Sequence, residues 1–177
     1  MTKQMTFDDI IGTVSDPVDR KTRKEDALDF GLNSDMQPTL HSSFPLEGES
    51  LAETLQRVSA SLLKFRVDIE KALEYAYGSY NYDDVVAGVM RGRFIFYTLG
   101  NSFAFCELEQ APQYSYFHVF LAGGNMKEVM YGMETYFYDI ARDMGAKYIA
   151  CRGREGWVRA LKDQGWEPRY TTLYKEL

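Results

Sequence analysis

The sequence of 177 residues predicts an α/β fold with a mixed sheet: an antiparallel meander, then a β-α-β-α-β run, behind a long N-terminal helix. Three observations lead to this fold class. Apolar residues recur every three or four positions after Ser50. Three short strand-like segments with brief connections follow Arg93, and helical and strand-like segments alternate from residue 125 onward.

Ser50 is expected to begin the long helix, because Ser50-x-x-Glu53 forms a capping box that satisfies free amides of the first turn. The apolar stripe runs to about Tyr77, and we expect it to pack on a sheet; a coiled-coil seam is the alternative. A second, short helix is expected from Asp83, as its cap, to Arg91, although its β-branched residues also fit a strand. The stripe consists of Leu51, Leu55, Val58, Leu62, Phe65, Ile69 and Leu73.

The C-terminal half supplies the sheet. Short connections between its first three strands indicate an antiparallel meander. The expected order is strands at 94–99, 102–109 and 114–122, a helix at 125–144, a strand at 147–151, a helix at 156–164 and a last strand at 168–173.

Residues 1–49 are predicted to be an acidic N-terminal arm and linker, and residues 50–177 the folded domain. The arm carries 10 acidic and 5 basic residues, whereas the rest of the chain carries 16 and 15. The stretch 33–49 contains prolines, glycine and serines without a sustained period, which favours a linker. Few apolar residues are present to offset the entropy of ordering the arm, so we expect it to bind another chain.

Several partner classes are disfavoured by composition. A nearly neutral domain behind an acidic arm lacks the basic stripe of a nucleic-acid-binding protein. The N-terminus does not resemble a signal peptide, and no apolar stretch approaches the roughly 18 residues that span a membrane. Two cysteines, Cys106 and Cys151, and two histidines, His41 and His118, stand at no ligand spacing, so no metal site is expected.

Three glycine motifs lie at the junctions of the predicted elements. Gly123-Gly124 leaves the third strand of the meander, residues 153–157 read Gly-Arg-Glu-Gly-Trp, and Gly165-Trp166 ends the last helix. With the element order, these motifs resemble the GNAT-type N-acetyltransferase superfamily over residues 93–177, and most closely the small GNAT-like proteins of tailed bacteriophages.

The phage-type resemblance implies a virion-associated or assembly protein that uses the fold as a binding scaffold without a cofactor. Its partners would be other phage structural proteins, bound through the arm, and an oligomer is allowed. The protein would be found in the cytoplasm of the host cell or in the virion.

The resemblance also implies an alternative, an acetyl-CoA-dependent N-acyltransferase that acts on an amine. In the family, a loop of pattern R/Q-x-x-G-x-G/A holds the pyrophosphate of the cofactor. Carried onto this chain, the cofactor-binding residues are Gly123, Gly124 and Asn125. Aligning Gly124 with the first glycine places Leu121 and Met126 at the other signature positions, which departs from the pattern.

No catalytic residue is assigned from the sequence. Leu161 stands where the family usually has a tyrosine as general acid. His118 is expected to be a hydrogen-bonded structural residue, with a base as the alternative. By simple alternation, Glu107 and Glu109 share a strand face with two phenylalanines, which indicates a strand that passes from core to solvent; a catalytic carboxylate is the alternative. Trp157 is expected to anchor the last helix in the core.

Overall fold

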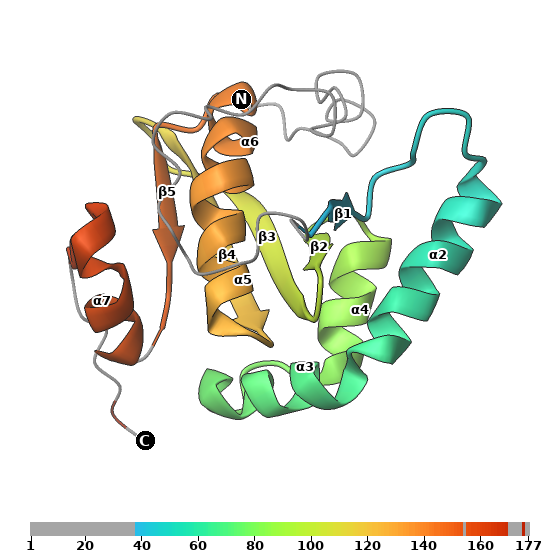
Figure 1. Ribbon diagram of the computed structural model, residues 1–177, viewed down its shortest axis with the longest axis horizontal. Coiled ribbons are helices and arrows are strands. Elements are labelled where there is room, and N and C mark those ends of the chain that lie inside the picture. The colour runs from blue at the N-terminus through green and yellow to red at the C-terminus, as the bar shows by residue number, and fades with distance from the viewer. Residues whose placement is uncertain (1–37, 154, 170–174, 176–177) are drawn as a thin grey trace.

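The computed structural model describes residues 38–153, 155–169 and 175, and places five strands in one mixed sheet of order β1-β2-β3-β4-β5 (Figure 1). Neighbouring strands are antiparallel except for β4 and β5, which are parallel. The predicted mixed sheet with its antiparallel meander is therefore confirmed. The strands are β1 (Leu40–Ser42), β2 (Ile95–Leu99), β3 (Ser102–Gln110), β4 (Ser115–Gly123) and β5 (Tyr148–Cys151).

Helices cover both faces of this sheet. One face is packed by α2, α3 and α4, and the other by α5, α6 and α7. A π-helical turn, Met133–Phe137, joins α5 to α6 into one continuous rod (Figure 1). The helices are α2 (Leu51–Lys64), α3 (Arg66–Leu73), α4 (Tyr82–Met90), α5 (Met126–Gly132), α6 (Tyr138–Asp143) and α7 (Glu155–Leu161), with short 3-10 turns at Glu74–Ala76 and Lys162–Gln164.

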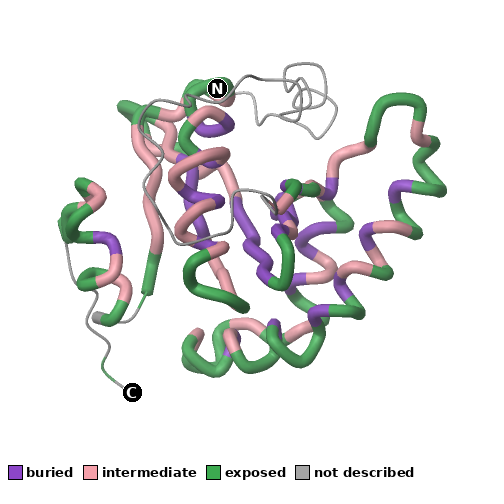
Figure 2. Tube along the Cα trace, viewed as in Figure 1, coloured by how far each residue is buried: buried purple, intermediate pink, exposed green. Residues whose placement is uncertain are grey.

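The two faces bury different kinds of side chain. The core under α5 and α6 is largely aliphatic, while in the core under α2–α4 five of the eleven buried residues are phenylalanines. Buried residues follow β2, β3 and β4 and the helix sides that face them, whereas the outer sides of the helices are exposed (Figure 2). Burying two such layers is the main stabilising term of the fold.

The long helix predicted after Ser50 is present but broken. Its capping box forms as expected, with the Ser50 hydroxyl accepting from the Glu53 amide. The break is at Phe65, whose φ of −93° and ψ of 5° leave the helical region. The bend turns α3 along the sheet, so that Phe65 and Ile69 stay buried and the Phe65 ring lies 5.7 Å from that of Phe103.

The short helix predicted after it is also present, but its cap differs. Asn81, not Asp83, is the N-cap of α4, and it forms a capping box with Asp84. Asp83 lies within the first turn, where its charge is favourable to the helix dipole. The helical alternative is therefore correct for this segment, and the strand alternative is wrong.

The linker predicted for residues 33–49 is interrupted by a short strand in its described part. Leu40–Ser42 forms β1, which pairs with β2 and buries Leu40. The following loop is held by Arg57 of α2, which pairs with Glu49 and donates to the carbonyl oxygen of Ser42. A three-residue strand is too short to show a hydrophobic period, so the sequence could not reveal it.

Two expected segments lie largely outside the described residues. The arm up to residue 37 is one, and most of the last strand predicted at 168–173 is the other; Pro168 and Arg169 are described and are not in a strand.

Trp157 is half-buried against the α5–α6 core, and a side chain at Gly153 would collide with its ring. Among the described helices, none has the length and apolarity needed to cross a membrane.

Candidate functional site

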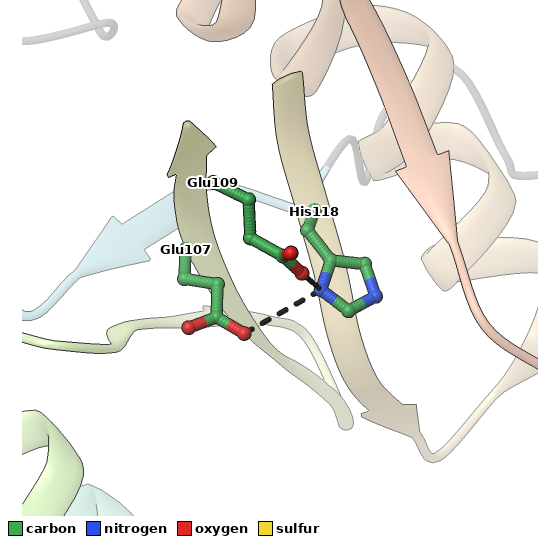
Figure 3. A group of neighbouring side chains, drawn as sticks. All are labelled: Glu107, Glu109 and His118. Carbon is green, nitrogen blue, oxygen red and sulfur yellow. Dashed lines mark ion pairs between the residues drawn. The ribbon is translucent and has the colours of Figure 1, made fainter. Parts of the chain in front are cut away.

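Three titratable side chains converge on the face of the sheet that α2–α4 cover, next to the aromatic core. Glu107 and Glu109 extend from β3 toward His118 of β4 (Figure 3). The antiparallel register places Glu107 opposite His118 and Glu109 opposite Tyr116. The Nδ1 atom of His118 lies 2.6 Å from a carboxylate oxygen of Glu109 and 3.4 Å from one of Glu107.

Two arginines balance the charge of these carboxylates. Arg93, which precedes β2, lies 3.2 Å from Glu107, and Arg152, which follows β5, lies 3.6 Å from Glu109. The hydroxyl of Tyr116 also donates to Glu109. Burial by itself would raise the pKa of Glu107, but its contacts with His118 and Arg93 outweigh burial, and the pKa is lowered. Glu107 is therefore ionised at neutral pH.

The imidazole of His118 is enclosed, with only 1% of the residue exposed. A carboxylate can only accept a hydrogen bond, so the nearby Nδ1 is the nitrogen that carries the proton in the neutral ring. The Glu109 oxygen lies off the ideal N–H direction, and neither ring nitrogen has an aligned hydrogen bond within the described part of the chain. The Nε2 atom is thus left as a buried acceptor that lacks a donor there.

The strand that carries His118 changes its pairing just beyond it. Phe105 of β3 lies opposite Leu121, and the next residue, Cys106, lies opposite Val119, so Phe120 is an extra residue that forms a bulge in β4. The parallel ladder with β5 ends at the Val119–Cys151 pair. β4 continues to Gly123, and over residues 120–123 its β5 side has no strand partner among the described residues.

The predicted cofactor-binding residues Gly123, Gly124 and Asn125 join this free stretch of β4 to α5. Gly124 adopts a φ of +101°, and a Cβ there would lie 2.4 Å from the backbone oxygen of Asn101. A Cβ at Gly123 would meet the Phe103 ring at 2.7 Å. Both glycines are therefore required by packing, whether or not a ligand binds.

The first turn of α5 is already used by the protein. The Asn125 side chain accepts from the Lys127 amide, and the Glu128 carboxylate accepts from the Asn101 amide and the Ser102 hydroxyl. Leu121 and Met126, which occupy the altered signature positions, are apolar, and Met126 is exposed. A negatively charged ligand at this turn would meet the Glu128 carboxylate.

A cavity of about 500 Å³ lies elsewhere, between the β1–β2 edge and α2, and none of the three clustered residues lines it. Arg57 lines this cavity, and its guanidinium donates to Glu49 and to the backbone oxygens of Ser42 and Phe44. The cavity therefore adds no free cationic donor from Arg57.

Sequence reasoning placed Glu107 and Glu109 on the same face as Phe103 and Phe105, and the aromatic core confirms this. It did not predict that both carboxylates meet His118. That contact depends on the strand register, which one sequence does not reveal. Leu161 is buried in the core, so its position supplies no general acid.

Comparisons with known proteins bear on the fold. No family model and no curated protein matches the chain. A solved structure described as a probable acetyltransferase matches with a TM-score of 0.50 and 10% identity, covering 78% of this chain and 99% of the other. An aminoglycoside acetyltransferase from an uncultured soil metagenomic sample, solved in complex with sisomicin, matches with a TM-score of 0.50 and 8% identity, covering 81% and 98%.

The fold is that of GNAT-type acetyltransferases. At these identities the likeness concerns the fold alone, so activity has to be argued from the site. The comparisons lend no support to the phage-type resemblance, and the virion role, the phage partners and the host location stay predictions.

Proposed function

We propose that the protein is an N-acyltransferase that transfers the acetyl group of acetyl-CoA to an amine. The observation that carries the proposal is the free stretch of β4 at residues 120–123, which begins immediately after the pair Val119–Cys151 and two residues beyond His118. It supplies a place for an extended ligand next to a group that can accept a proton. Acetyltransferases with the same fold support the proposal.

The residues present fit the pantetheine arm of acetyl-CoA better than its diphosphate. A strand without a neighbour offers backbone N–H and C=O groups to an extended amide chain, as in strand addition. The pantetheine arm is such a chain, and residues 120–123 would hold it. The turn at Gly123, Gly124 and Asn125 would lie nearest the diphosphate, where the negative charge of Glu128 makes binding weak.

The transfer needs a base, because an alkylamine is protonated at neutral pH and cannot attack while its lone pair is occupied. Bound acetyl-CoA would supply the thioester, whose C–S bond breaks as the new N–C bond forms. The cluster of Glu107, Glu109 and His118 contributes acceptors for the ammonium proton, and a cationic amine could take the place of Arg152 beside Glu109.

Calorimetry on the pure protein tests the proposal. We expect acetyl-CoA to bind with a dissociation constant of roughly 10–100 μM, or about −7 to −5 kcal/mol. An acetylpantetheine fragment should retain most of this affinity, and adenosine 3′,5′-bisphosphate should retain little. Thiol release should then follow the addition of a primary amine from a panel that includes sisomicin, a polyamine and a peptide N-terminus.

Absence of binding up to millimolar acetyl-CoA would contradict the proposal. That result would favour the scaffold function implied by the phage-type resemblance. Leu63→Ala, on the exposed side of α2, is the matched control and should bind as the wild type does.

A further inference from the structure

We infer that His118 is the general base of the acyl transfer and that Glu109 is its positioning residue. The inference rests on the proposed function and adds the group that removes the proton from the amine. Its basis is the geometry of the cluster: an enclosed imidazole whose Nδ1 lies 2.6 Å from a carboxylate, on the strand that borders the free edge.

The tautomer of His118 gives its two ring nitrogens different roles. The Glu109 carboxylate favours the tautomer with the proton on Nδ1, which leaves the Nε2 lone pair available. Nε2 is buried without a partner in the described residues, and a buried acceptor without a donor is destabilising until one arrives. An ammonium group is such a donor, and its proton would pass to Nε2.

The carboxylates stabilise the protonated imidazole, and their own partners hold the carboxylates in place. Once Nε2 gains the proton, the imidazolium lies against Glu109 and within 3.4 Å of Glu107, whose negative charges stabilise it. Arg93 and the Tyr116 hydroxyl in turn hold the two carboxylates in place. These contacts to the carboxylates hold the imidazole of His118 in one orientation.

The same three residues could in principle ligate a cation, and the surrounding charge argues against it. Glu107 and Glu109 are neutralised by Arg93 and Arg152, so a dication would be added to a site that is already balanced. The 2.6 Å contact is also shorter than the separation of about 3 Å between two ligands that each lie about 2.1 Å from a metal at right angles.

The amine would reach Nε2 from the end of β5. Arg152 follows the last residue of that strand, its side chain is 67% exposed, and at 3.6 Å it is the loosest contact of the cluster. Displacement of this side chain by a cationic amine would leave the charge of the cluster unchanged. The amine would then lie beside β4 at the point where its free stretch begins.

The step balances without a further reagent. The ammonium N–H bond breaks and its proton binds Nε2, the freed lone pair forms the N–C bond, and the C–S pair leaves with the thiolate. The new amide nitrogen then gives its second proton to the thiolate, which leaves as the thiol, and the proton on Nε2 passes to water, which restores the neutral ring. His118 thus acts as base and needs no partner acid such as the missing tyrosine.

The test combines three variants with a pH–rate profile. His118→Gln should keep the dissociation constant of acetyl-CoA and lower kcat/KM about 10²–10⁴-fold. Glu109→Gln should lower kcat/KM about tenfold and move the acid limb of the profile to lower pH, because the imidazolium loses its carboxylate partner. Glu107→Gln makes the same charge change at the more distant carboxylate and should move the limb less.

The possible results separate failure of the base assignment from failure of the proposed function. If acetyl-CoA binds and His118→Gln turns over as the wild type does, the base assignment is wrong and the proposed function stands. If no acetyl-CoA binds to any form, both fail. Should His118→Gln not fold, an unmoved acid limb in Glu109→Gln would still overturn the assignment. Loss of wild-type activity in a chelator, with recovery on adding Zn²⁺, would replace the base by a metal site.

Discussion

One face of the β3–β4 pair has two ends that differ in chemistry. At one end Phe103 and Phe105 are buried and pack against other aromatic rings; at the other, Glu107 and Glu109 lie beside His118. Both ends lie on one antiparallel ladder, and the bulge at Phe120 lies between them. The difference shows that the first end is held by packing, whose energy follows buried area, and the second by charges, whose energy depends on pH and on partners.

The largest expected effect is at the aromatic end. Phe105→Ala removes a ring with 0% exposure that contacts Phe94, Phe96 and Phe103, and should lower the free energy of unfolding by about 3–5 kcal/mol. Urea denaturation measures this. Leu63→Ala, at an exposed site, is the control and should change stability by less than about 0.5 kcal/mol. Similar losses in both variants would show that the aromatic core is not tightly packed.

At the charged end the expected effect is smaller and depends on pH. Glu107→Gln should lower stability by about 1 kcal/mol at neutral pH. The pKa of Glu107 is lowered in the folded protein from its ordinary 4.5, so its contribution is complete above that value and is lost as the pH falls through the folded pKa. Wild type and variant should therefore converge as the pH falls below the folded pKa. A difference that does not shrink as the protein is acidified would refute the charge-based account.

The smallest effect is expected for the hydroxyl of Tyr80, which lies where the two ends meet. Its ring packs edge-on against Phe120 at 4.8 Å, and its hydroxyl accepts from Arg93 at 2.9 Å. Tyr80→Phe loses only the half-exposed hydrogen bond and should cost about 0.5 kcal/mol. Tyr80→Leu also loses the aromatic contact and should cost about 1 kcal/mol more. Equal thermal shifts in the two variants would mean that the ring contributes nothing beyond its hydroxyl.

From Ser50 to Gln164 the sequence predicted the order of helices and strands, because helix caps, strand alternation and turn residues are local. Strands were placed within a residue or two at residues 94–122, and the Ser50 capping box was identified. The break at Phe65 was not, since both halves of the helix keep the same apolar spacing while the backbone bends between them. The aromatic side chains mark a core face but not where a helix must turn to follow it.

The candidate site was less accessible to sequence reasoning. His118 and the two carboxylates were each noticed, yet each was given its ordinary structural role. Their association depends on a cross-strand pairing of Glu107 with His118, and the bulge at Phe120 changes the register only a few residues away. A single chain contains no signal for either feature. By contrast, the glycine pair was found from its motif, and packing accounts for both residues.

The short strand β1 protects the protein from aggregation through its sheet edge. It covers the outer edge of β2, a segment of sequence Ile-Phe-Tyr-Thr-Leu, and the Ser43 amide and hydroxyl complete the cover at Phe96. An uncovered strand of that composition is a template for pairing with another copy. Cleavage between Phe44 and Ser50 would therefore release a domain that retains most of its core and aggregates through β2, so proteolysis of this loop and loss of solubility should occur together.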